Sequence, residues 1–235
     1  MTKHQKALSS PKTYPIKRKE RTWAIKPSPG PHSEENCVPL GIIIRDVLGY
    51  AENVSEVKEI LKQGKCDVDG REIRDHRFPL GIFDSLRLGD EYFRLVPSKK
   101  GFELVRIDKK QAGKKLCRVE DKTVLSGDDI QLSLNDGRTV LADTEKLENV
   151  ETGSSVIVSL DENECEEILE LEEGQEVIVK GGKNRGEIAS FKEKKVLKGS
   201  RENRVLVEQD GKEIDLPESL VIPIDKDEIK IDAED

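Results

Sequence analysis

Apolar positions in the first half of the chain repeat with helical spacing in two short segments. The first segment follows the i, i+3, i+4, i+7, i+8 pattern of a helix with one buried face, at Leu40, Ile43, Ile44, Val47 and Leu48. Gly49 is expected to end this helix. Ser55 is a good N-cap for a second helix, whose inward positions are Val57, Ile60 and Leu61.

A tight hairpin is predicted directly after the second helix. Gly64 stands where the end of a helix favours a residue that tolerates positive φ. Asp69 and Gly70 then form a two-residue turn of the type that suits a right-twisted hairpin. Cations surround this frame, namely Lys58, Lys62, Lys65, Arg71, Arg74 and Arg77. Such a cluster fits a phosphate backbone, and it fits an ordinary solvated surface equally well.

The second half of the chain alternates apolar and polar residues with the period of two that is typical of strands. The clearest case is residues 130–134, followed by an Asn-Asp-Gly-Arg turn at 135–138 and a return strand at 139–142. Further strands are predicted at 156–158, 174–180 and 188–191, and in a hairpin made by 204–208 and 212–215. This pattern predicts small antiparallel β modules.

The composition limits the size of any core. Charged residues make up 37% of the 235 residues and hydrophobic residues 34%, so we expect several small modules, each with a thin core. The four cysteines form no C-x-x-C pair, which argues against a metal site or a disulfide framework and favours buried reduced thiols. No apolar run approaches the roughly 20 residues of a membrane span, and the polar, basic start lacks a signal-peptide core, so a cytoplasmic location is expected.

The charge is distributed unevenly along the chain. The net charge of -8 argues at first against a nucleic-acid partner. However, residues 1–27 carry eight lysines and arginines against one acid, Glu20, and most acids lie in the second half. Because binding depends on the local potential, a protein with one basic face is a reasonable interpretation.

Residues 1–36 are predicted to form an extended basic arm, because their five prolines discourage helix. Tyr14 and Trp23 lie among the cations, and an aromatic ring beside basic residues can stack on an unpaired base. The candidate RNA-binding residues of the arm are Lys3, His4, Lys12, Lys17, Arg18, Lys19, Arg21, Trp23 and Lys26. The alternative is a disordered tail whose cations bind nothing specific. The only tryptophan of the chain lies here, which favours binding.

Other segments carry weaker candidates. The glycine-rich loop 181–186 does not fit the Walker phosphate-binding pattern, because Lys183 is followed by Asn184 and no apolar helix follows. Three lysines of the β region are further possible RNA contacts, although lysines there are usually only solvated: Lys114, Lys115 and Lys122. The close carboxylates of residues 162–167 fit a solvated acidic face better than a catalytic pair or a metal site. We therefore expect no catalytic residues, no metal and no cofactor.

The hairpin and its neighbours resemble a known family. Residues 38–96 resemble the S-four type of RNA-binding domain, with two short helices and a G-K-x-x-V-D-G-R hairpin at Gly64, Lys65, Val68, Asp69, Gly70 and Arg71. The surrounding motifs are similar to those of archaeal and eukaryotic small-subunit ribosomal protein S-four-e, at residues 15–20 (PIKRKE), 23, 29–33 (PGPHS), 39–40, 45–48 and 75–81 (D-x-x-F-P-x-G). Residues 174–200 resemble a KOW motif, with its glycines at 182 and 186.

The resemblance implies an α+β protein in five parts. These are a basic Pro-rich arm (1–36), a small α/β S-four-like RNA-binding module (37–97), a central antiparallel β domain (98–172), a C-terminal SH3-like (KOW) β-barrel (173–224) and an acidic tail (225–235). The RNA-binding candidates outside the arm are Arg45, Lys58, Lys62, Lys65, Arg71, Arg74, Lys183, Asn184 and Arg185.

The function implied by the resemblance is that of a non-enzymatic constituent of the small ribosomal subunit in the cytoplasm. Its partners would be small-subunit ribosomal RNA and neighbouring small-subunit ribosomal proteins, with no membrane and no small-molecule substrate. Two alternatives use the same modules, an RNA-modifying enzyme and a translation or transcription factor. The enzyme would need a catalytic domain, and the two β modules contain no histidine, since all three lie in the first 80 residues.

Overall fold

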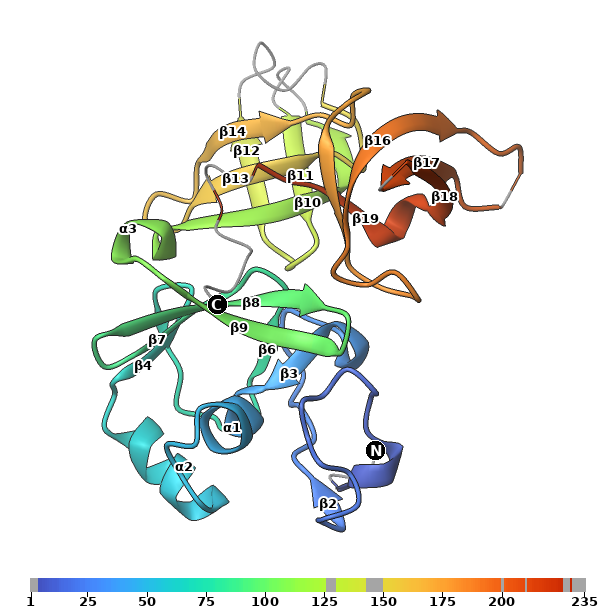
Figure 1. Ribbon diagram of the computed structural model, residues 1–235. Helices are drawn as coiled ribbons and strands as arrows, with labels where there is room; N and C mark the ends of the chain where they lie inside the picture. The colour runs from blue at the N-terminus through green and yellow to red at the C-terminus, as the bar shows by residue number, and fades with distance from the viewer. Residues whose placement is uncertain are drawn as a thin grey trace. The chain divides into compact units, whose positions relative to one another are not determined.

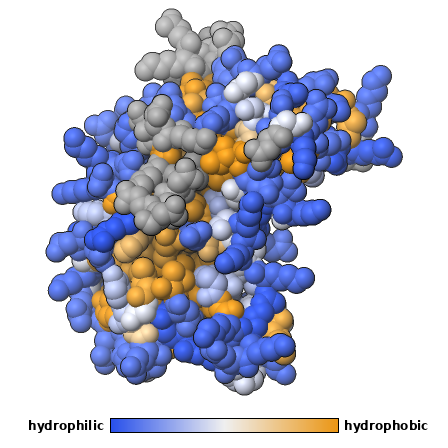
Figure 2. All heavy atoms as spheres, in the orientation of Figure 1, coloured by the Kyte–Doolittle hydropathy of each residue, from blue (hydrophilic) through white to orange (hydrophobic). Residues whose placement is uncertain are grey.

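The computed structural model describes residues 4–125, 130–142, 150–199, 201–209, 211–225 and 229. The chain is mostly β with few helices, and it divides into two compact units (Figure 1). The described residues up to Gly113 belong to the first unit, and those from Lys114 onward belong to the second. Hydrophilic residues cover most of the face seen in Figure 2, as the high charged fraction predicts.

The described part of the first unit carries three short α-helices: α1 (Leu40–Ile42), α2 (Val54–Lys62) and α3 (Lys109–Ala112). Helix α1 continues as a π-helical turn over Ile43–Val47, in which the Leu48 N–H donates to the Ile43 carbonyl at 2.9 Å. Because a π-helical turn joins residues five apart, it rotates Val47 off the apolar stripe and leaves it 40% exposed. The predicted inward position of Val47 is therefore wrong, whereas Leu40 and Ile44 are buried.

Helix α2 begins after Asn53, whose Oδ1 accepts a hydrogen bond from the Glu56 N–H at 3.0 Å. The prediction of Ser55 as the cap is wrong, because Asn53 supplies the same kind of acceptor two residues earlier. Val57 is fully buried on the inner face of the helix. Gly64 follows the helix with a φ of +69°, as predicted.

A five-stranded antiparallel sheet forms the body of the first unit, in the order β5-β4-β7-β8-β9. Its strands are β4 (Cys66–Val68), β5 (Arg71–Glu72), β7 (Ser85–Leu88), β8 (Glu91–Ser98) and β9 (Gly101–Ile107). Asp69 and Gly70 join β4 to β5 with φ values of 49° and 74°, the two positive values that a type I′ turn needs. The predicted hairpin is thus confirmed, and it places Arg71 directly opposite Val68.

One small strand pair lies within the amino-terminal segment, residues 4–36, and a second begins directly after it. Strands β3 (Cys37–Pro39) and β6 (Pro79–Gly81) pair with each other, as do β1 (Gln5–Lys6) and β2 (Trp23–Ala24). His32 Nε2 lies 3.0 Å from both carboxylate oxygens of Asp84, and both side chains are buried. Gly81 leaves room for this ring, because a Cβ there would lie 2.3 Å from it. The segment therefore folds back against the unit, which differs from the predicted extended arm.

The second unit contains two five-stranded antiparallel sheets. The first has the order β12-β11-β10-β13-β14, with β10 (Lys114–Val124), β11 (Ile130–Leu134), β12 (Thr139–Ala142), β13 (Ser155–Ser159) and β14 (Cys165–Leu169). The second has the order β18-β17-β16-β15-β19, with β15 (Glu176–Val179), β16 (Ile188–Lys195), β17 (Arg204–Gln209), β18 (Lys212–Pro217) and β19 (Val221–Pro223). The predicted hairpins of this half are confirmed.

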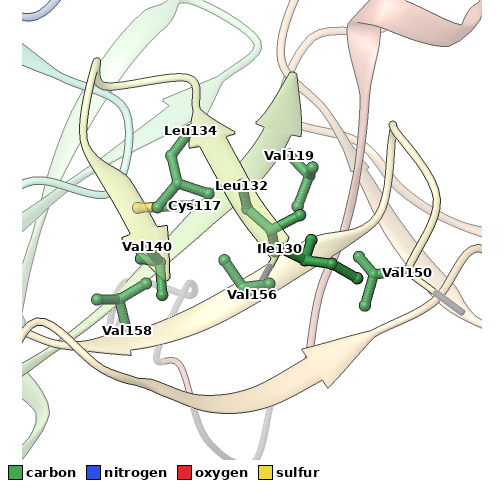
Figure 3. Close-up of a cluster of buried hydrophobic side chains, with 9 residues drawn as sticks. All are labelled: Cys117, Val119, Ile130, Leu132, Leu134, Val140, Val150, Val156 and Val158. Atoms are coloured by element: carbon green, nitrogen blue, oxygen red, sulfur yellow. The ribbon is translucent and has the colours of Figure 1, made fainter. Parts of the chain in front are cut away.

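Strand β10 curls the first of these sheets around its own core. It pairs with β13 through its first half and with β11 through its second, and the register shifts between Val119 and Asp121. Such a bulge bends the strand and increases its twist. The enclosed side chains point toward one another (Figure 3), and they are Cys117, Val119, Ile130, Leu132, Leu134, Val140, Val150, Val156 and Val158.

Candidate nucleic-acid interface

The pairing of β1 with β2 brings His4 to Trp23. Their ring centroids are 5.8 Å apart and their planes are tilted by 58°. Trp23 is nevertheless 57% exposed, which is unusual for so large an apolar ring. The structure thus leaves the predicted stacking residue accessible to a ligand.

Tyr14, the other aromatic residue of the segment, is buried and only 3% exposed. Burial, followed by the neighbouring Cys37 and Glu34, raises the pKa of the Tyr14 hydroxyl. Its ring belongs to the core of the first unit, so the prediction that Tyr14 could stack on a base is wrong. Composition alone does not distinguish Tyr14 from Trp23, because both lie among the same prolines and cations.

Some cations of the amino-terminal segment lie close to an acid of the same unit. Lys17 pairs with Glu20 at 3.0 Å, and Arg21 is 3.6 Å from Asp46. The remaining candidates of the segment are exposed or half-buried: His4, Lys12, Arg18, Lys19 and Lys26. Lys3 lies outside the described residues. Lys6, which the sequence criteria do not select, is exposed on β1 beside these residues.

Arg45 is held by its neighbour in the chain. Its Nε and Nη2 atoms donate to the two carboxylate oxygens of Asp46 at 2.9 and 2.7 Å. The Arg45 side chain is only 8% exposed. A bidentate pair of this kind fixes the guanidinium, so the Nε and Nη2 donors of Arg45 are already used by Asp46.

The junction between α2 and the hairpin carries three lysines. Lys58, Lys62 and Lys65, here called the junction lysines, are all exposed, and within the described ranges none is within ion-pair distance of an acid. The pKa of His76 is lowered, mainly by burial and next by the positive charge of the nearby Lys58. Arg71 is also exposed, as is Arg74, whose Nε donates to Glu72 at 2.6 Å. Among the predicted sites, the junction lysines are therefore well placed to meet phosphates.

The glycine loop of the second unit is a tight turn between β15 and β16. Gly182 and Gly186 adopt φ values of 80° and 75°, and the Gly186 N–H donates to the Val179 carbonyl at 2.8 Å. Lys183 is exposed at the tip. Arg185 is half-buried, and this burial lowers its pKa. Asn184, also half-buried, accepts from the Glu187 N–H at 3.1 Å through its carbonyl.

Lys115 is buried and does not lie on the protein surface. Its Nζ donates to Asp136 Oδ2 at 2.8 Å, and both side chains are almost fully buried. Burial alone would raise the pKa of Asp136, but the Lys115 ammonium, a hydrogen bond from it and the Arg138 backbone N–H outweigh burial and lower that pKa. The suggestion that Lys115 touches RNA is therefore wrong.

The cysteines match the expectation of buried thiols. Cys37, Cys66 and Cys117 are buried and Cys165 is half-buried, all four as free thiols. Burial raises the pKa of the Cys66 thiol to about 12, which keeps it protonated and unreactive at neutral pH. Within the described ranges, no group of three or more histidine, cysteine and acidic side chains is arranged to hold a metal ion. None of the described helices is long and apolar enough to cross a membrane.

Comparison with known proteins places this geometry in context. A model described as the RS4NT (NUC023) domain matches residues 1–35, and the model of ribosomal family S4e matches residues 89–165. Small ribosomal subunit protein eS4 of Staphylothermus marinus is 39% identical over 237 residues, which covers 96% of this chain and 93% of the relative. The protein of the same name from Methanothermobacter thermautotrophicus is 39% identical over 231 residues, which covers 96% of this chain and 93% of that relative.

A solved structure shows the same fold. The crystal structure of the 30S ribosomal protein S4e from Thermoplasma acidophilum matches with a TM-score of 0.69 and 26% identity, covering 80% of this chain and 95% of that one. The mostly β fold and these relatives place the chain among the ribosomal proteins. It belongs to ribosomal family S4e, the S-four-e family that its sequence motifs resemble.

Proposed function

We propose that this chain is a structural constituent of the small ribosomal subunit and binds small-subunit ribosomal RNA. One observation carries the proposal, the 39% identity to small ribosomal subunit protein eS4 of Staphylothermus marinus across 96% of the chain. A relationship that covers 96% of the chain extends beyond any one of the basic surfaces described above. The function would therefore require all parts of the chain and not one borrowed module.

We propose three contact surfaces on this RNA. The first is the amino-terminal segment with its exposed cations and Trp23. The second is formed by the junction lysines together with Arg71 and Arg74. The third is the glycine loop, where Lys183 is exposed and the glycines allow a close approach of the backbone. The division into an S-four-like module, a central domain and a KOW barrel is part of the same proposal.

The mechanism would be electrostatic and structural. Lysines and arginines neutralise phosphates and release counterions, while aromatic stacking and backbone amides fix the register on the RNA. The protein would act without catalysis, in the cytoplasm, beside neighbouring proteins of the small subunit. No observation in the described part of the chain favours the RNA-modifying alternative, since the three buried thiols and the buried His32 are all engaged in the core.

Binding of the full chain to purified ribosomal RNA tests the proposal. The protein should bind small-subunit ribosomal RNA more tightly than large-subunit ribosomal RNA, and the affinity should fall steeply as salt rises. Equal affinity for both RNAs at every salt concentration would contradict a specific role in the small subunit.

A further inference from the structure

A pocket lies beside Trp23 in the first unit. Its volume is about 240 Å³, and its apolar lining includes Pro15, Ile16, Trp23 and Ala24. Since a liquid water occupies about 30 Å³ and pockets for drug-sized ligands start at about 300 Å³, this volume suits one small planar group. The buried Ile42 also lines the pocket.

Charged side chains make up much of the remaining lining, and they are Lys17, Glu20, Arg21, Arg45 and Asp46. Arg45 and Asp46 both line the pocket, and their bidentate pair presents donors and acceptors side by side. Arg21 lines it as well, 3.6 Å from Asp46, with 49% of its side chain exposed. The pocket therefore combines one exposed aromatic ring and a few apolar side chains with hydrogen-bonding charged groups, which suits a flat heteroaromatic ligand with polar edges.

A cationic groove adjoins the pocket. It has a volume of about 370 Å³ and shares Glu20 and Arg21 with the pocket lining. Lys6, Arg18 and Lys19 complete its charge, and the acid Glu20 is already paired with Lys17 at 3.0 Å. The groove therefore holds four cations and one acid, and one of these cations, Arg21, also lies near an acid outside the groove, Asp46. This complementarity fits the phosphates of a polynucleotide.

We propose that the groove and the pocket together bind one nucleotide of an unpaired RNA strand, with its phosphates along the groove and its base in the pocket against Trp23. The proposal rests on the proposed function, and it names the chemical form of the RNA that this surface takes. A base inside an A-form duplex cannot enter such a pocket, whereas a base in a loop or bulge can be splayed out and stacked. The tilted contact with His4 orients the indole without laying a parallel ring over it.

The test compares base-bearing and base-free strands on the full chain. Binding of labelled oligoadenylate and of an abasic ribose-phosphate oligomer of the same length is measured by fluorescence anisotropy for the natural protein and for Trp23→Leu. Stacking on one base is worth roughly a 5- to 150-fold change in affinity. Trp23→Leu should lose this factor for oligoadenylate and leave the affinity for the abasic oligomer unchanged. Trp23→Phe, which keeps a ring, should recover most of the loss.

A matched control is Tyr50→Leu, which removes another exposed aromatic ring of the first unit that does not line the pocket. It should leave both affinities unchanged. As a second measurement, the fluorescence of the only tryptophan of the chain should be quenched by oligoadenylate and not by the abasic oligomer. This readout needs no variant, so it decides the question even if Trp23→Leu folds poorly.

The proposal is overturned if Trp23→Leu lowers the affinity for oligoadenylate and for the abasic oligomer by the same factor. It is also overturned if the two oligomers quench the fluorescence of Trp23 to the same extent. Binding of small-subunit ribosomal RNA is measured on the same samples. If that binding is intact while the base-dependent difference is absent, only the base pocket is wrong. If that binding is absent, the proposed function itself fails.

Discussion

Replacing the three junction lysines with glutamine, as K58Q/K62Q/K65Q, should weaken binding to small-subunit ribosomal RNA in a salt-dependent way. The structure shows all three ammonium groups exposed and, among the described residues, without an acidic partner. Each is therefore free to neutralise a phosphate. Glutamine keeps the length of the side chain and has nearly the helix propensity of lysine, so α2 should persist.

The magnitude follows from counterion release. Each phosphate contact contributes about 0.7 to 0.9 to the slope of log affinity against log salt, so losing three contacts should reduce the slope by about 2 to 3. If natural and variant proteins bind equally at about 1 M salt, the variant should bind roughly 100- to 500-fold more weakly at about 0.1 M. Circular dichroism should show no loss of helix.

The assay is a salt titration of RNA affinity by filter binding, with K195Q/K198Q as a control that removes two lysines instead of three. Lys195 and Lys198 are also exposed, but they lie on and after β16 in the second unit and belong to none of the three proposed surfaces. The control should lower the affinity by less than the triple variant and leave most of the slope. A triple variant with an unchanged slope, or a control with the larger effect, would refute the assignment of this surface.

Three further outcomes follow from the buried groups. Tyr14→Ala should lower the free energy of unfolding by about 3–5 kcal/mol in urea denaturation, because it empties a buried aromatic site, and a loss below about 1 kcal/mol would contradict that packing. The ionised form of Asp136, whose folded pKa is lowered by Lys115, stabilises the fold above the usual unfolded pKa of about 4, and this part is lost as the pH falls through the folded value. Asp136→Asn should therefore flatten the pH dependence of stability below about pH 4, measured as thermal midpoints, and an unaltered dependence would count against the buried pair. Alkylation of the native protein at neutral pH should label Cys165 first, with peptide mapping as the readout, and early labelling of Cys66 would show that its thiol is not buried.

Local signals in the sequence predict much of the fold. The Gly64 helix end and the Asp69–Gly70 turn each depend on the backbone conformation of one or two residues, which residue type largely decides. The hairpin around residues 135–138 follows from the same chemistry. These local signals also position the junction lysines, which lie on α2 and beside Gly64, so that surface can be predicted from the sequence alone.

The sequence-based predictions are wrong where the position of a side chain depends on irregular backbone or on contacts with residues distant in the chain. The π-helical turn at 43–47 breaks the regular helical period, so Val47 turns outward. Tyr14 and Lys115 look like surface residues by composition, but contacts with Cys37 and Asp136 bury them. The pocket beside Trp23 combines residues from 7 to 46, and no local pattern predicts such a combination.

Membership of the small subunit is tested most directly by sedimentation of the native protein. In sucrose gradients of cell extract at low salt, the protein should co-migrate with small ribosomal subunits and their RNA. At high salt it should be released to the top of the gradient, because the proposed contacts are largely with phosphates. Migration with free protein at every salt concentration, or with large subunits alone, would contradict the account.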